Sequence, residues 1–327
     1  MITFEHNSRT YNFKVFDAHN HIGLDKEGTV KDSAYSDLEN VLGNIDKTVL
    51  FPANSPVSGP FGILSNMKIL DATQESKGKV VPFYRFDIFE AEGCKYWQTG
   101  LCDAAHRCLI KKCFNIECCS DFDLEKFFME IKQSGFLGLK LHPRASEIDY
   151  ITPQLDSDIM LKIIPAAGKA GLAVTMHTHN SKMLAEFFNL AKKVLPEHKK
   201  LVLICAHSGG GSTQLERKES REYAGKRLNN CLNSGEEWVS RMLFETSNVF
   251  WTYLLNGLLL CKNLQKTDKS TENIKNIVYG TDWPFVKDIT PEQKATNIIK
   301  SLLSGGFNEN DIDMIMYSNL ENRIKEL

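Results

Sequence analysis

Short apolar runs alternate along the chain with segments of helical periodicity. Most of the apolar runs are continuous, which is typical of strands buried on both faces of a parallel sheet. We therefore predict strands over residues 14–21, 47–53, 80–88, 136–142, 172–178, 201–207, 248–254 and 276–282. Helices are predicted over 33–45, 62–77, 123–134, 156–170, 180–195, 236–246 and 291–304, and a last helix over 309–325 is expected on the outside of the domain.

Helix-starting residues support three of these helices. Asp123, Asn180 and the pair Thr290-Pro291 stand where the helical patterns begin. Aspartate, asparagine and threonine cap helix N-termini well, and proline is favoured in the first turn.

The succession of about eight strand-plus-helix units predicts a (β/α)8 TIM barrel, an α/β fold. A doubly wound open sheet is the alternative, but no glycine-rich phosphate loop follows the first strand. We expect one domain over residues 1–327, with long insertions after the third and sixth strands at 90–122 and 208–235. Loops that follow barrel strands lie at the C-terminal face, where active sites form, so both insertions are predicted lids or pocket walls.

Composition narrows the class of protein. The chain has 327 residues, of which 42% are hydrophobic and 24% charged, and its net charge is −2. This near-neutral charge gives no support for a nucleic-acid or membrane partner. The N-terminus lacks the pattern of a signal peptide, and no apolar run approaches the roughly 18 residues of a membrane helix. We expect a cytoplasmic location; the oligomeric state stays open, with a homodimer as one option.

Cysteines are concentrated in the first insertion. The chain has nine, and six of them are Cys94, Cys102, Cys108, Cys113, Cys118 and Cys119. Their spacing contains no CxxC pair and matches no zinc or iron–sulfur pattern. Free thiols in a lid are the favoured interpretation, and a second metal site that includes His106 is the alternative.

Histidines gather at the predicted strand ends. His19 and His21 are two residues apart on one strand, so their side chains point to the same face. Two imidazoles buried together require a partner for their nitrogens, and a metal ion would provide one. Six of the nine histidines lie at such strand ends: His19, His21, His142, His177, His179 and His207.

Each of these residues also has a simpler interpretation. A single strand-end histidine is more often a hydrogen-bonded polar residue than a ligand. A single aspartate such as Asp282, after Gly280-Thr281, is usually a turn or cap residue. Lys140 within an apolar strand can reach solvent from a strand edge. Taken together, however, HxH, Lys, His, His and Asp at the ends of the strands predict a metal site.

The ordered set resembles a known family. The segments Asp17-Ala18-His19-Asn20-His21, 138–143, 206–210 and Gly280-Thr281-Asp282-Trp283-Pro284 are similar to those of the amidohydrolase superfamily, and most similar to its amidohydrolase-related (amidohydrolase 2) branch. The resemblance spans residues 14 to about 290. That branch contains hydrolases, aminocarboxymuconate-semialdehyde decarboxylase and related non-oxidative decarboxylases.

The resemblance implies roles for particular residues. His19, His21 and His177 would bind the metal, and Asp282 would be a ligand or accept a proton from the bound water. His207 would act beside that water, so Asp282 and His207 are the expected catalytic residues. One divalent ion is favoured, zinc before manganese or iron. Two ions are the alternative, if Lys140 is carboxylated and bridges them.

Further residues are candidates for substrate binding. Lys140, His142, Arg85 and Arg144 would hold an anionic group, although a structural ion pair is the alternative for each arginine. Trp283 would line the pocket or fill the core.

The predicted activity is hydrolysis of an amide, ester or lactone bond of a small, carboxylated substrate by zinc-activated water. The alternative is a decarboxylase or other lyase with the same fold and metal. A DNase of the TatD type is less favoured, because such enzymes use a glutamate where Lys140 stands and the net charge offers nothing for DNA. A non-catalytic, metal-binding regulator is also less favoured, because it would need no proton-transferring residues such as His207 and Asp282.

Overall fold

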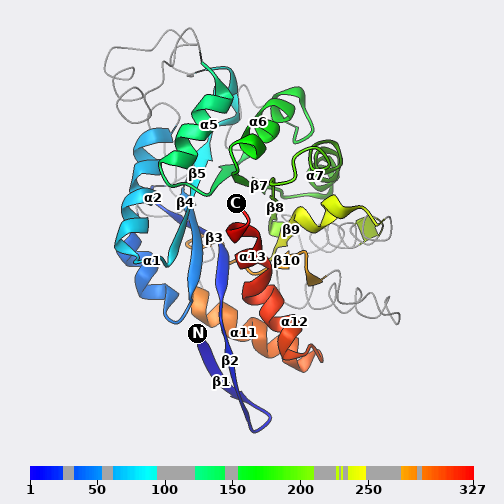
Figure 1. Cartoon of the computed structure of the whole chain (residues 1–327). Coiled ribbons are helices and arrows are strands. Elements are labelled where there is room, and N and C mark those ends of the chain that lie inside the picture. Colours follow the sequence, from blue (N-terminus) through cyan, green and yellow to red (C-terminus); the bar gives the residue numbers. More distant parts are fainter. Residues whose placement is uncertain are drawn as a thin grey trace.

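The computed structural model describes residues 1–24, 33–53, 62–93, 122–143, 154–209, 226–227, 230, 235–247, 274–285 and 289–327. Eight parallel strands form one sheet in chain order (Figure 1). They are β3 (Phe16–Ile22), β4 (Lys47–Pro52), β5 (Val80–Phe86), β6 (Gly138–Leu141), β7 (Ala173–His177), β8 (Leu203–Ala206), β9 (Met242–Glu245) and β10 (Ile277–Val278).

The sheet closes into a barrel where the first and last strands meet. Ala18 N–H donates to Tyr279 O (2.9 Å), His21 N–H donates to Trp283 O (2.8 Å) and Asp282 N–H donates to His19 O (2.8 Å). These bonds continue the parallel pairing from β10 to β3. The structure is therefore the predicted (β/α)8 barrel.

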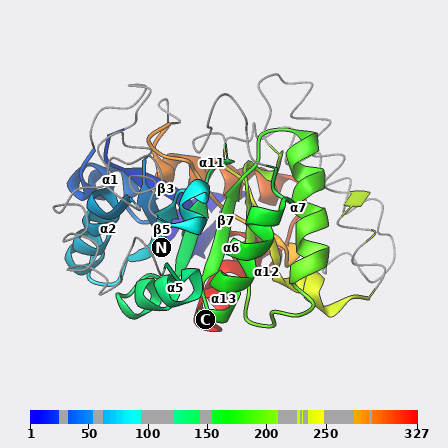
Figure 2. The ribbon, with the colours of Figure 1, turned by 90° about the horizontal axis from the view of Figure 1, so that it is seen from above.

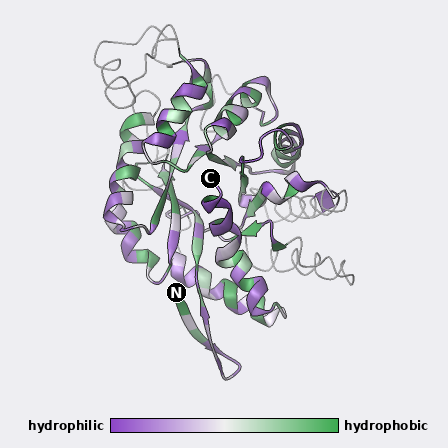
Figure 3. Cartoon of the chain, in the orientation of Figure 1, coloured by the Kyte–Doolittle hydropathy of each residue, from purple (hydrophilic) through white to green (hydrophobic). Residues whose placement is uncertain are grey.

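Helices surround the sheet, except for the last one, which lies across one end of the barrel (Figures 1 and 2). They are α1 (Tyr35–Leu42), α2 (Ile63–Glu75), α5 (Leu124–Gln133), α6 (Asp158–Lys169), α7 (Ser181–Val194), α11 (Pro291–Ser304), α12 (Glu309–Asp313) and α13 (Asn319–Lys325). The hydropathy colouring shows both hydrophilic and hydrophobic residues on these helices (Figure 3), as expected of amphipathic segments that cover a sheet. None of the helices in the described part of the chain has the length and apolar composition of a membrane span.

The predicted helix starts are confirmed by side-chain caps. Asp123 accepts hydrogen bonds from the backbone N–H groups of Glu125 and Lys126 at the start of α5. Asn180 caps α7 through Met183 N–H. Thr290 forms a reciprocal capping box with Gln293 at the start of α11.

Two apolar clusters form the core. The larger lies between the sheet and the surrounding helices. The smaller fills the barrel near the N-terminal ends of the strands, where Phe16, Val81 and Val278 pack with Leu320 and Ile324 of α13. Figure 1 shows α13 in the middle of the ring of strands, and Figure 2 shows it at one end of them. The last helical segment thus closes the bottom of the barrel; the prediction that it packs on the outside is wrong.

The seventh strand also differs from the prediction. The segment predicted as a helix over 236–246 contains a 3₁₀ helix, Glu237–Arg241, followed by β9. A run of four apolar and acidic residues is too short for periodicity to separate strand from helix. The strand predicted over 248–254 lies outside the described residues.

The N-terminal segment forms an antiparallel hairpin, β1 (Ile2–His6) with β2 (Arg9–Phe13), that was not predicted. Within the insertion expected over 90–122, the structure describes only 90–93 and 122. Within the one expected over 208–235, it describes 208–209, 226–227, 230 and 235. The lid interpretation and the six-cysteine cluster therefore fall outside the described residues.

Candidate metal centre

The strand-end residues meet at the C-terminal mouth of the barrel. His19 and His21 come from β3, Lys140 from β6 and His177 from β7, while His207 directly follows β8 and Asp282 follows β10. His19 and Lys140 are fully buried, and His21, His207 and Asp282 are at most 8% exposed. The parallel barrel brings them together because all strands end at the same face.

His19, His21 and Asp282 form the tightest part of the site. The Nε2 atoms of the two imidazoles lie 3.1 Å apart. Oδ1 of Asp282 lies 3.3 Å from Nε2 of His19 and 3.3 Å from Nε2 of His21. The predicted side-by-side projection of the HxH pair is thus observed, with a carboxylate against it.

The other ring nitrogens of the pair already have acceptors. Nδ1 of His19 lies 3.0 Å from Oε2 of Glu245, and Nδ1 of His21 lies 3.3 Å from the carbonyl oxygen of Pro52. A carbonyl or carboxylate oxygen can only accept, so each Nδ1 carries the proton of the neutral ring. Burial and the nearby Lys140 lower the pKa of His19 well below its ordinary value, which keeps it neutral. Two Nε2 lone pairs and a carboxylate oxygen therefore converge, as a divalent cation requires.

His207 lies beside two members of this group. His19, His207 and Asp282 each offer a ligand atom within 4.8 Å of the others. His207 and Asp282 also have positive backbone φ angles, of 62° and 61°. Such angles are uncommon for residues with a Cβ and often mark functional sites. Burial lowers the pKa of His207 and raises the pKa of Asp282.

His177 lies at the edge of this group. Its Nδ1 is 3.1 Å from Nε2 of His207, and its Nε2 is buried with no hydrogen-bond partner. The ring of His142 stacks on it at 3.8 Å between centroids. The structure therefore brings His177 against His207, and the group of ligand atoms within 4.8 Å of one another contains His207 with His19 and Asp282 but not His177. His179 follows His177 by two residues in the chain, and its Nδ1 lies 2.9 Å from the sulfur of Met183.

Lys140 and Arg85 place positive charge beside the histidines. Nζ of Lys140 lies 3.3 Å from Nε2 of His19 and 4.7 Å from the centre of the Phe51 ring. Burial lowers the pKa of Lys140 to about 7, against the opposing effect of Asp282. Arg85 is the register partner of Lys140 on the neighbouring strand β5, and its guanidinium donates to Pro52 O (3.2 Å).

Two other predicted substrate contacts have different outcomes. Trp283 is partly buried and packs against the larger core cluster. Of its two expected roles, lining the pocket and filling the core, it has at least the second. Arg144 lies outside the described residues.

Glu245 was missed by the sequence analysis. It is the last residue of β9 and is fully buried. Its carboxylate contacts the HxH pair at His19, where Oε2 lies 3.0 Å from Nδ1 of the ring. The available signal was an acidic residue after the apolar run Met242-Leu243-Phe244, but that run was assigned to a helix.

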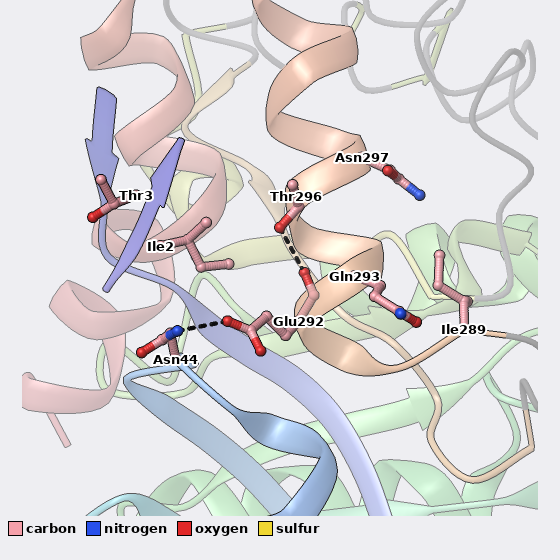
Figure 4. Close-up of a pocket in the computed structure, with 8 residues that line it drawn as sticks. All are labelled: Ile2, Thr3, Asn44, Ile289, Glu292, Gln293, Thr296 and Asn297. Atoms are coloured by element: carbon pink, nitrogen blue, oxygen red, sulfur yellow. Dashed lines mark hydrogen bonds between the residues drawn. The ribbon is translucent and has the colours of Figure 1, made fainter. Parts of the chain in front are cut away.

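A separate groove lies beside α11, away from these residues (Figure 4). It is lined by Ile2, Thr3, Asn44, Ile289, Glu292, Gln293, Thr296 and Asn297. Asn44 donates to the Glu292 carboxylate (2.7 Å), and Thr296 donates to the backbone oxygen of Glu292 (2.9 Å). These polar groups pair with one another, and the groove contains none of the strand-end residues.

Comparison with known proteins gives similarity in structure only. No protein-family model matches the sequence, and no curated protein matches it. A probable 2-pyrone-4,6-dicarboxylic acid hydrolase from Acinetobacter baumannii, with citric acid bound, has a TM-score of 0.59 at 14% identity, over 95% of this chain and 99% of that one. A 2,6-dihydroxybenzoate decarboxylase from Rhizobium has a TM-score of 0.59 at 13% identity, over 96% and 99%.

A third similar structure is an amidohydrolase from Burkholderia multivorans with bound zinc, with a TM-score of 0.58 at 9% identity over 95% of this chain and 99% of that one. These similarities extend over nearly the whole length of both chains. At such low identity they establish the fold alone, a (β/α)8 barrel. The fold expected from the sequence resemblance is therefore confirmed.

Proposed function

We propose that the chain is a metal-dependent hydrolase that cleaves an amide, ester or lactone bond of a small, carboxylated compound. The observation that carries this proposal is the convergence of His19 Nε2, His21 Nε2 and Asp282 Oδ1 within 3.3 Å of one another. Two neutral imidazoles and a carboxylate in a buried position match the ligands of catalytic zinc sites.

The proposed ligands are His19, His21 and Asp282, with His177 or His207 as the further nitrogen donor. His177 is the ligand that the family resemblance implies, whereas His207 is the histidine that lies closer to the group. When bound there, a divalent ion lowers the pKa of a water molecule and polarises a substrate carbonyl. Zinc is favoured, and manganese or iron would suit the same ligands.

Asp282 and His207 are the proposed proton-transferring groups. Oδ1 of Asp282 lies 3.3 Å from Nε2 of both His19 and His21, which places it to accept a proton from water at the proposed ion. The lowered pKa of His207 keeps its ring neutral, so Nε2 accepts a proton and passes it to the leaving group. Both side chains belong to the buried group, where water is limited and their charges act strongly.

Lys140 and Arg85 support a carboxylated substrate. They are adjacent on β6 and β5, and the positive charge of Arg85 contributes to the lowered pKa of Lys140. An anionic group bound between them would relieve this repulsion. His142, and also Arg144 and Trp283, remain candidate substrate contacts.

A decarboxylase is the second candidate, because similar barrels include both a decarboxylase and hydrolases. The deciding experiment incubates the zinc-loaded protein with a panel of small aromatic carboxylates, lactones and amides. Hydrolysis in ¹⁸O-labelled water incorporates the label into the product carboxylate, whereas decarboxylation releases carbon dioxide and leaves a decarboxylated product without the label. Absence of turnover on all substrates after zinc loading would contradict both candidates.

We also propose a homodimer and a cytoplasmic location. A homodimer would be recognised by size-exclusion chromatography with light scattering. A cytoplasmic location would be recognised by fractionation of the source cells. The substrate is a small molecule in either case.

A further inference from the structure

Glu245 has an unusually complete set of hydrogen bonds for a buried side chain. Oε2 accepts from His19 Nδ1 (3.0 Å), from the backbone N–H of His207 (3.0 Å) and from Ser247 Oγ (2.8 Å). Oε1 accepts from the backbone N–H of Ser247. The carboxylate also lies so close to Gly280 that a Cβ there would be 2.0 Å from Oε1. The position is therefore built around this carboxylate.

The first bond determines which nitrogen of His19 is free. A carboxylate without a proton can only accept, so Nδ1 of His19 donates to Glu245. The neutral ring then has no proton on Nε2. That atom lies 3.1 Å from Nε2 of His21, 3.3 Å from Oδ1 of Asp282 and 3.3 Å from Nζ of Lys140, which can donate to it.

A second path runs from the same oxygen to His207. The Ser247 hydroxyl donates its only proton to Oε2 of Glu245. It can therefore only accept from His207, whose Nδ1 lies 2.8 Å away. Nδ1 of His207 carries the proton, and Nε2 is again the atom without one.

Glu245 also holds the backbone of His207. The positive φ angle of 62° at His207 continues at Ser208, with 46°. The N–H of His207 is bound by the Glu245 carboxylate, and the hydroxyl of Ser208 donates to the backbone oxygen of Glu245 (2.7 Å). Strained conformations of this kind persist where the surrounding bonds determine them.

We propose that Glu245 is a positioning residue that sets the tautomers of two histidines at once, His19 directly and His207 through the Ser247 hydroxyl. Both Nε2 atoms are thereby left without a proton, and that of His207 lies 3.1 Å from Nδ1 of His177. This inference rests on the proposed metal-dependent function, which it deepens. One oxygen, Oε2 of Glu245, would then set the tautomer of the metal ligand His19 and of the proton-transferring residue His207.

The network has two arms: the direct bond from Glu245 to His19, and the relay from Glu245 through Ser247 to His207. They can be separated by substitution in the full-length protein. Ser247→Ala removes only the arm to His207, whereas Glu245→Gln disturbs both arms. Ser240→Ala is the matched control, since its hydroxyl is exposed and bonds only to the Glu237 backbone oxygen. The readout is two-bond ¹H–¹⁵N NMR of the histidine side chains in metal-free protein at neutral pH, which identifies the protonated nitrogen of each ring.

In the unsubstituted protein and in Ser240→Ala, we expect both His19 and His207 as the Nδ1–H tautomer. In Ser247→Ala, His207 alone should lose this preference. The kcat of this variant should fall by about tenfold or more with little change in KM. Its zinc affinity should change by less than about threefold if His177 is the further nitrogen donor, and should fall by more if His207 is. In Glu245→Gln, both rings should change, and zinc affinity should fall by about 10- to 100-fold.

Several outcomes would overturn the inference. One is an Nε2–H tautomer at His19 or His207 in the unsubstituted protein, and another is an unchanged His207 tautomer in folded Ser247→Ala. If Glu245→Gln fails to fold, Ser247→Ala still tests the relay, and the unsubstituted spectrum tests the direct arm. The tautomers are read without metal or turnover. Expected tautomers in a protein that binds no zinc would therefore contradict the proposed function alone.

Discussion

The Nε2 atoms of His19 and His21 lie 3.1 Å apart, and both rings already donate from Nδ1 to other acceptors. Two lone pairs at this separation repel each other, and the Asp282 carboxylate adds negative charge at 3.3 Å from both. A cation at this position would turn the repulsion into ligation. A bound cation would therefore explain why His19, His21 and Asp282 are buried side by side.

Metal uptake follows from this geometry. Metal-free protein should bind about one divalent ion per chain, measured by elemental analysis after dialysis against zinc and gel filtration. Zinc at 100 times its dissociation constant should raise the free energy of unfolding by about 2.7 kcal/mol, seen as a higher unfolding midpoint. Chelation should abolish turnover, and zinc should restore it. A chain that stays metal-free in zinc would contradict the proposed site.

Asp282→Asn tests the carboxylate separately from the fold. Asparagine has the same shape, and the backbone bond from residue 282 to His19 O does not need the carboxylate. Turnover should fall by at least about 100-fold because both a ligand charge and a proton acceptor are lost. The circular dichroism spectrum of the metal-free variant should be unchanged. Asp71→Asn, on an exposed position of α2, is the matched control. An undiminished rate would remove Asp282 from the mechanism.

Lys140→Met distinguishes a substrate-binding amine from a bridge between two ions. Methionine fills a similar volume without the charge. If Lys140 holds a substrate carboxylate, KM should rise by about tenfold or more while the metal content stays near one ion per chain. Because the amine is fully buried, the variant should be about as stable as the parent or more stable. A fall in metal content from about two ions to one would instead identify a carboxylated bridge.

The bottom of the barrel provides a test of stability against pH. The buried Glu321 carboxylate accepts from Nζ of Lys47 (2.9 Å) and Nζ of Lys325 (2.9 Å). Burial alone would raise the pKa of Glu321, but the two lysines outweigh it and lower the pKa below 4.5. A carboxyl with a lowered folded-state pKa stabilises the protein above its unfolded-state pKa. This contribution is lost as the pH falls through the lowered value.

Glu321→Gln should therefore lower the free energy of unfolding by about 1–3 kcal/mol at neutral pH, measured by urea denaturation. The difference from the parent should shrink below about pH 4. Glu326→Gln, an exposed partner of Arg323, should change stability by less than about 0.5 kcal/mol. A difference that persists unchanged at low pH would show that the ion pairs are not its cause.

Local chemistry explains most of what could be predicted from the sequence. The strands from β4 to β8 are mostly apolar because both faces of each strand are covered, and such runs are recognisable without the fold. The caps at Asp123, Asn180 and Thr290 act within one helical turn of themselves. Strand alternation predicts that His19 and His21 lie on one face, and this holds although the register of β3 shifts between Asp17 and Asn20. The barrel and the position of its mouth follow from the number and order of these units.

Other features depend on contacts between residues far apart in the chain. Glu245 follows an apolar run too short to be identified as a strand. Its role exists only because β9 lies next to β8 and its last side chain reaches His19 of β3. The approach of His207, rather than His177, to the His19 and Asp282 group depends on a left-handed backbone that Glu245 holds across 38 positions. The last helix closes the barrel because its apolar face meets the bottom layer of strand residues. The sequence by itself determined which side chains reach the mouth of the barrel. Only the tertiary structure decided their hydrogen-bonding partners and therefore which nitrogen each histidine presents, because those partners come from other strands.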